Sequence, residues 1–113
     1  MDTKTVQLIG HPKDGHLRDV TAFEIRNNES IFVPYVPQDA TYDDVAYAEY
    51  SRFLAGTNRG QLMMWVNPHS PMQALQQVVE SLLSGERRTE GVWVLQGADM
   101  HGQLQLLPLE STE

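Results

Sequence analysis

Apolar and polar positions alternate in short segments separated by turn-forming residues. Apolar runs cover Thr5 to Ile9 and Leu62 to Val66. The second run is apolar at every position, which favours a central strand buried on both faces. Two further runs, Val92 to Gln96 and Gln103 to Leu107, flank a turn rich in glycine and predict a hairpin near the end of the chain.

Another pair of runs, Val20 to Arg26 and Ile31 to Val36, flanks Asn27-Asn28-Glu29-Ser30. This arrangement predicts a hairpin as well. Pro34 lies inside the second run. Because proline has no amide hydrogen to donate, we expect its strand at a sheet edge or at a bulge.

Two segments have helical signals. Ser70 to Gln73 forms an S-x-x-Q capping box with proline at the first helical position, and apolar residues then recur at helical spacing up to Gly85. Earlier in the chain, Thr41 precedes two carboxylates that would favour the positive end of a helix dipole. These residues predict a helix from Tyr42 to about Ala55, ended by Gly56.

The predicted order of elements is therefore β-β-β-α-β-α-β-β. It indicates an α+β fold with a mixed or antiparallel sheet of about five to six strands and two helices. The chain contains no repeat and no long linker, so residues 1–113 are expected to form a single domain. Short flexible ends are expected at residues 1–4 and 110–113.

Composition narrows the classes of function. Fifteen acidic residues against eight basic ones give a net charge of −7, which argues against direct binding to nucleic acid or to an anionic membrane. The absence of cysteine excludes disulfides and sulfur-ligated zinc. The first residues lack the apolar core of a signal peptide, and the longest apolar run is far shorter than the ~20 residues that span a bilayer. We therefore expect a cytoplasmic protein.

The charge is concentrated between Asn27 and Ser51, where acids and all four tyrosines occur without a lysine or arginine. Such a surface can attract a basic partner and then bind it with rigid aromatic rings. On the expected helix, four residues would point outward, and acids from the flanking loops would add charge. The candidate partner-binding residues are Glu29, Asp39, Asp43, Asp44, Tyr47 and Ser51.

Glu49 has a separate position on the same expected helix, on its apolar side. A buried carboxylate is costly unless it is paired, and Arg52 is three residues further on, within helical reach. Glu49 is therefore a candidate preorganised acceptor for a basic partner. The alternative is a carboxylate at the rim of the helix that reaches water.

The sequence contains no phosphate-binding glycine loop, zinc-protease motif or esterase motif. Two histidines and an aspartate lie close together in one loop, at His11, Asp14 and His16. It can be interpreted as a solvated turn, or as the site of a small hydrolase or metal-dependent enzyme assisted by Glu49 or Asp99. The first interpretation predicts no catalytic residue, metal or cofactor.

The sequence thus favours a small, acidic, non-enzymatic protein that binds a basic or nucleic-acid-binding protein and inhibits or regulates it. Immunity proteins and phage-encoded inhibitors of host machinery have comparable size and charge. Besides the enzyme, the alternative is a structural subunit of a larger assembly, in which the Pro34 strand or the last hairpin contacts a neighbour. The oligomeric state stays open. A homodimer could use the polar side of the second helix, formed by Gln73, Gln76, Gln77 and Glu80.

Overall fold

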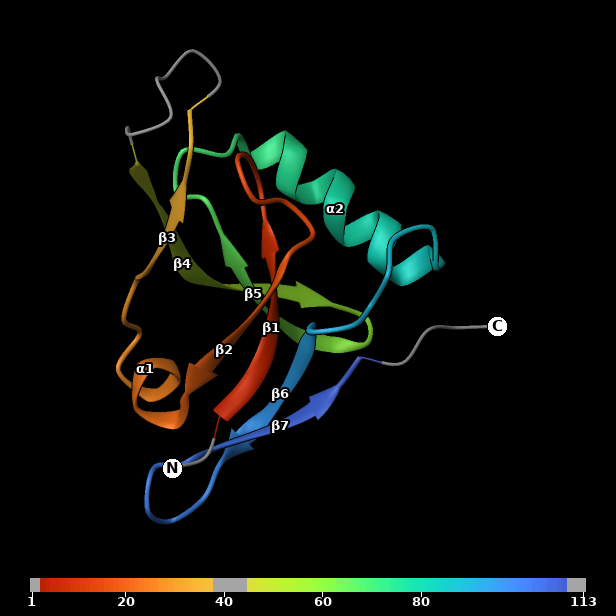
Figure 1. Ribbon diagram of the computed structural model, residues 1–113. Helices are drawn as coiled ribbons and strands as arrows, with labels where there is room; N and C mark the ends of the chain where they lie inside the picture. Colours follow the sequence, from red (N-terminus) through yellow and green to blue (C-terminus); the bar gives the residue numbers. More distant parts are fainter. Residues whose placement is uncertain (1–2, 38–44, 110–113) are drawn as a thin grey trace.

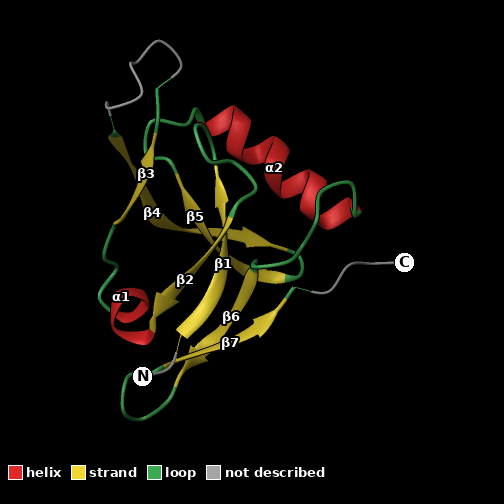
Figure 2. Cartoon of the chain, viewed as in Figure 1, coloured by secondary structure: helices red, strands yellow, loops and turns green. Residues whose placement is uncertain are grey.

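A computed structural model describes residues 3–37 and 45–109. Within these ranges the chain forms one curled, mixed, seven-stranded sheet and two helices, which confirms the α+β class (Figures 1 and 2). In chain order the elements are β1 (Thr3–Ile9), β2 (Leu17–Thr21), α1 (Ala22–Arg26), β3 (Ile31–Tyr35), β4 (Ala46–Thr57), β5 (Gly60–Val66), α2 (Met72–Ser84), β6 (Trp93–Ala98) and β7 (Leu104–Pro108).

The central strand β5 determines how the sheet curls. The main path of the sheet runs β2-β1-β5-β4-β3. In addition, β6 pairs with β5 on one side and with β7 on the other. The end of β5 pairs in parallel with β1, with Trp65 opposite Leu8. The beginning of β5 pairs in antiparallel fashion with β6, with Met63 opposite Trp93. β1 and β6 consequently diverge from one edge of β5, and the sheet folds around the space between them (Figure 1).

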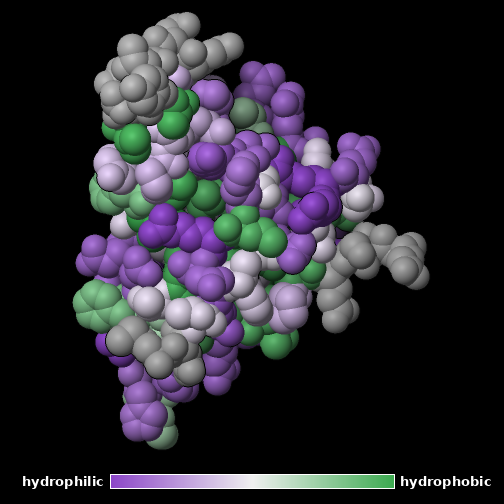
Figure 3. Space-filling model, viewed as in Figure 1, coloured by the Kyte–Doolittle hydropathy of each residue, from purple (hydrophilic) through white to green (hydrophobic). Residues whose placement is uncertain are grey.

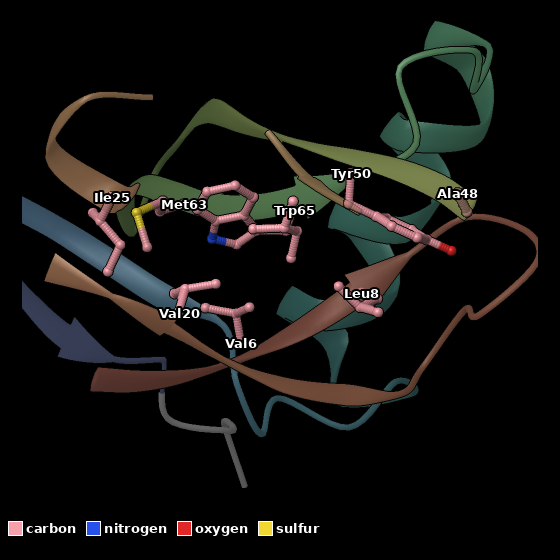
Figure 4. Packing of buried hydrophobic residues seen from close by; sticks show 9 residues of the cluster. Val6, Leu8, Val20, Ile25, Ala48, Tyr50, Met63 and Trp65 are labelled. Carbon is pink, nitrogen blue, oxygen red and sulfur yellow. The ribbon is translucent and has the colours of Figure 1, made fainter. Parts of the chain in front are cut away.

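The side chains of Leu62 to Val66 in β5 are buried on both faces, as the sequence predicts. Met63 and Trp65 belong to an inner cluster that the curled sheet encloses. In Figure 4, Trp65 and Tyr50 project toward Val6 and Leu8 of β1. The alternate residues of β5 face an outer cluster with Leu75 and Leu82 of α2. One strand therefore joins two separate apolar clusters.

Several predictions about single elements are confirmed. The first strand and the last hairpin form, and α2 ends at Gly85, whose φ of 85° is left-handed. Pro34 lies in β3, which pairs with β4 alone among the described residues and is therefore an edge strand. The capping box expected at Ser70 is wrong, because α2 begins at Met72 with Pro71 as its N-cap and no side-chain cap hydrogen bond.

The hairpin predicted from Val20 to Val36 is wrong. β2 ends at Thr21 and pairs with β1, and the next five residues form α1. A capping box starts this helix: the Thr21 hydroxyl accepts a hydrogen bond from the Glu24 amide at 3.1 Å, and the Glu24 carboxylate accepts one from the Thr21 amide at 2.9 Å. The T-x-x-E pattern is a sequence signal for this turn of helix. Thr3 and Lys4, expected in a loose end, pair with β2.

The helix predicted from Tyr42 to Ala55 is also wrong. Residues 46–57 form β4, which pairs with β3 along its first half and with β5 along its second half. Aromatic residues such as Tyr47, Tyr50 and Phe53 favour strands. Pairing with two strands from other parts of the chain therefore outweighs the local helix signal at Thr41, which lies outside the described residues along with the rest of 38–44.

Among residues 3–37 and 45–109, neither helix has the length and apolar character needed to cross a membrane.

Gly91 and Gly15 provide a matched test of the packing around β1. Both have a left-handed φ, 80° and 84°. A Cβ at Gly91 would lie 2.6 Å from the Gln7 amide nitrogen, whereas a Cβ at Gly15 would meet nothing within 4 Å. We expect Gly15→Ala to cost about 1 kcal/mol of unfolding free energy and Gly91→Ala about 2–4 kcal/mol. Urea denaturation measures both, and equal losses would contradict the close contact with β1.

Candidate protein-binding face

The β3–β4 pair presents one buried face and one exposed face. The residues Ile31, Val33 and Tyr35 lie opposite Tyr50, Ala48 and Ala46, and this set faces the inner cluster. Because side chains alternate along a strand, the intervening residues point outward. Phe32 lies opposite Glu49, and Pro34 lies opposite Tyr47. We call these four outward residues the β3–β4 face.

The β3–β4 face is open because α2 covers only part of the sheet. Phe53 and Ala55 have the same strand parity as Tyr47 and Glu49, and they pack against the outer cluster beneath α2. Tyr47 and Glu49, nearer the start of β4, are not among the residues that pack beneath α2. Phe32 is 56% exposed and Tyr47 is 66% exposed. Two aromatic rings on one small area of surface are typical of a protein-binding site rather than of a face turned only to solvent.

Exposed valines extend this apolar surface. Val36 follows β3 and Val45 precedes β4, and both are more than half exposed. Pro34 limits backbone pairing on the free edge of β3. The Arg18 guanidinium of β2 also donates to the Phe32 carbonyl oxygen at 3.0 Å. With this edge partly covered, a partner would meet side chains rather than a free strand edge.

Glu49 adds a negative charge to the β3–β4 face, since it lies opposite Phe32 and two residues after Tyr47 on the same side of β4. Its carboxylate accepts a hydrogen bond from the Ser30 hydroxyl at 2.8 Å and lies 3.5 Å from the Ser51 hydroxyl. The two hydroxyls are 3.0 Å apart. These contacts hold the carboxylate in place without neutralising it. The two salt bridges within the described residues, Arg87–Asp14 and Arg88–Glu90, do not include it.

The pairing of Glu49 with Arg52 that helical spacing would allow does not form. Positions three apart on a strand point to opposite faces, so the Arg52 side chain lies on the inner side and donates to the Ile25 carbonyl oxygen at 2.5 Å. The expected position of Glu49 on the apolar side of a helix is wrong for the same reason. Its carboxylate lies instead on the outer face of a strand, where Glu49 is partly exposed.

The other predicted binding residues do not form one helical surface. Tyr47 is exposed as expected, but on a strand, and Ser51 is half-buried beside Glu49. Glu29 is exposed in the turn between α1 and β3. Asp39, Asp43 and Asp44 lie outside the described residues. Sequence reasoning missed Phe32 and Pro34, although the alternation of Ile31, Val33 and Tyr35 would have placed them on the opposite face.

The loop with His11 and His16 is fixed by contacts to the rest of the protein. The buried Tyr50 hydroxyl donates to the Gly10 carbonyl oxygen at 2.8 Å and accepts from the Lys13 amide at 2.9 Å. Burial raises the pKa of Tyr50. These two hydrogen bonds tie the loop to β4, so the loop has a structural role.

Asp14 of the same loop is bound to the segment after α2. Its carboxylate accepts hydrogen bonds from the Arg87 guanidinium at 2.8 Å and from the Gly10 amide at 2.8 Å. Arg87 also donates to Gln7 at 2.7 Å. Partial burial alone would raise the pKa of Asp14, but the hydrogen bonds and the charge of Arg87 outweigh it and lower the pKa. No cluster of three or more potential metal ligands occurs among the described residues.

Comparisons with known proteins provide no relative: no family model, no curated protein and no solved structure matches this chain.

The Asp14–Arg87 contact predicts a pH-dependent contribution to stability. Because folding lowers the pKa of Asp14, its contribution is present above the unfolded value of about 3.9 and is lost as the pH falls below it. Asp14 is half-exposed, so Asp14→Asn should cost no more than about 1 kcal/mol at pH 7. Urea denaturation at neutral and acidic pH should show this difference shrinking in acid. The exposed Glu80→Gln is the control, and a pH-independent difference for Asp14→Asn would contradict the ion pair.

Proposed function

We propose that this protein binds a basic or nucleic-acid-binding protein through the β3–β4 face and thereby inhibits or regulates it. The supporting observation is the unneutralised carboxylate of Glu49 beside two exposed aromatic rings on an ordered pair of strands. In this proposal Tyr47 and Phe32 anchor the partner by apolar contact. Glu49 accepts hydrogen bonds from a lysine or arginine of the partner.

Electrostatics favour a basic partner over other classes. The net charge of −7 attracts a positively charged protein at long range and repels nucleic acid. Several arginines are engaged within the protein: Arg18 and Arg52 donate to backbone carbonyls, and Arg87 binds Asp14. They do not neutralise Glu49. The segment that joins β3 to β4 contributes three more acidic residues to the negative net charge: Asp39, Asp43 and Asp44.

The geometry of the strands supports a recognition role over a catalytic one. Both rings and the carboxylate lie on paired strands, where the backbone is held by its neighbours and little ordering is needed on binding. The alternative enzyme would use His11, Asp14 and His16, but the Asp14 carboxylate is already bound by Arg87 and Gly10. We place the proposed interaction in the cytoplasm, in keeping with the cysteine-free composition.

A partner found by co-purification from the native host allows a direct test by calorimetry. Tyr47→Ala and Phe32→Ala should each weaken binding by about 2 kcal/mol, roughly 30-fold, because buried aromatic anchors dominate such interfaces. Glu49→Gln should weaken binding and reduce its dependence on salt. Phe23→Ala is the matched control, since Phe23 is equally exposed at 58% but lies on α1.

Circular dichroism and thermal unfolding should show that the exposed-site variants keep their fold. If Tyr47→Ala combined with Asp43→Lys leaves the affinity unchanged, this face does not bind the partner. Light scattering on the purified chain addresses the alternative of self-assembly. An oligomer that dissociates on Tyr47→Ala or Phe32→Ala would show that the same face joins subunits of an assembly.

A further inference from the structure

A groove of about 440 Å³ lies away from the β3–β4 face, and the two share no residue. Segments distant in sequence form it: the start of β1, the helix α1 and the start of β7, which lie near one another at the lower left of Figure 1. Its volume is within the range of small-molecule binding sites. The lining residues are Thr3, Lys4, Ala22, Phe23, Ile25, Arg26, Gln103, Leu104 and Leu106.

The interior of the groove is apolar. Ile25 is almost fully buried and belongs to the inner cluster, and Leu104 and Leu106 pack against that cluster. Phe23 lines the same groove from α1 and remains 58% exposed. Exposed apolar atoms are visible over α1 in Figure 3. An apolar chain or ring in the groove would cover this surface and gain from leaving water.

The charged residues that the structure describes at the groove are basic, whereas the whole protein is acidic. Lys4 and Arg26 are among its lining residues, and none of the lining residues within 3–37 and 45–109 is acidic. Within residues 3–37 and 45–109, neither side chain takes part in a salt bridge. In a chain of net charge −7, two cations that form no ion pair within the part of the chain that the structure describes are suited to bind an anionic group beside the apolar groove.

The Lys4 side chain is oriented by an aromatic ring. Its ammonium nitrogen lies 4.6 Å from the centroid of the Trp93 ring, a cation–π distance. The Trp93 indole nitrogen donates to the Thr5 carbonyl oxygen at 2.8 Å, which fixes the ring against β1. Because a bound anion would draw the ammonium group away from the ring or alter its field, Trp93 is a built-in fluorescent reporter for the groove.

We propose that this groove binds a small amphipathic carboxylate, a single aliphatic chain or ring that carries one carboxylate. The carboxylate interacts with Lys4 and Arg26, and the apolar part lies against Phe23, Leu104 and Leu106. A polar phosphorylated ligand would leave these apolar walls without a partner, and an amine would meet two like charges. The inference is independent of the proposed protein partner, because the groove and the β3–β4 face use different residues.

The test measures binding of hexanoate, octanoate, decanoate and 3-phenylpropanoate below their micellar concentrations, by calorimetry and by tryptophan fluorescence. Octanol and octylammonium are the matched neutral and cationic probes. We expect saturable binding of at least one carboxylate, with a change in fluorescence that is lost in Trp93→Phe. Lys4→Gln and Arg26→Gln should each weaken binding by about fivefold, and Phe23→Ala should weaken it as well.

Two control variants make the same change in net charge or in aromatic content as the groove variants, but at positions outside the groove. Arg88→Gln removes an exposed cation elsewhere, and Phe32→Ala removes an exposed ring of the β3–β4 face, so both should bind the carboxylates normally. The proposal is overturned if no carboxylate binds saturably, or if octanol or octylammonium binds as tightly. It is equally overturned if anionic vesicles or an acidic peptide bind through Lys4 and Arg26 while the free carboxylates do not.

Discussion

The burial of β5 on both faces is the constraint on which the other elements depend. A strand with Trp65 and Met63 on one side and Leu62, Met64 and Val66 on the other needs an apolar cover for each. The curled sheet provides the first cover and α2 the second. Since α2 is only 13 residues long and lies over β5 and the second half of β4, neither helix of the described residues covers the outer side of β3 or of the first half of β4. The exposed β3–β4 face is a direct result of this geometry.

The same packing explains how the charges are distributed. Arginine side chains are used to complete the hydrogen bonds of carbonyl groups at strand edges and helix ends, as Arg18 does for Phe32 and Arg52 does for Ile25. Arg87 joins the loop after β1 to the segment after α2 through Asp14 and Gln7. These cations stabilise the fold where they are and do not reach Glu49. The cation-rich groove beside α1 is then a local exception within an acidic protein.

Predictions from local patterns were accurate where one periodicity dominated. The apolar run at Leu62–Val66 and the helical spacing from Met72 to Leu83 each favour one type of element, and both are confirmed. The apolar pattern around Tyr47 is compatible with both helical and strand periodicity. In either element the Tyr47 side chain points outward. Its exposure was therefore predicted correctly although its element was not. The position of Arg52 relative to Glu49, by contrast, depends on the type of element. Residues three apart lie on the same face of a helix but on opposite faces of a strand.

The sequence by itself determined the α+β class, the doubly buried central strand, the second helix, the last hairpin and the acidic balance, because these follow from composition and short-range periodicity. Only the tertiary structure decided that residues 46–57 form a strand, that Phe32 joins Tyr47 and Glu49 on one face, and that Lys4 and Arg26 line one groove. Each of these depends on pairing between segments distant in the chain. Local propensities of a few tenths of a kcal/mol per residue are too weak to determine such pairing when burial and strand pairing favour another arrangement.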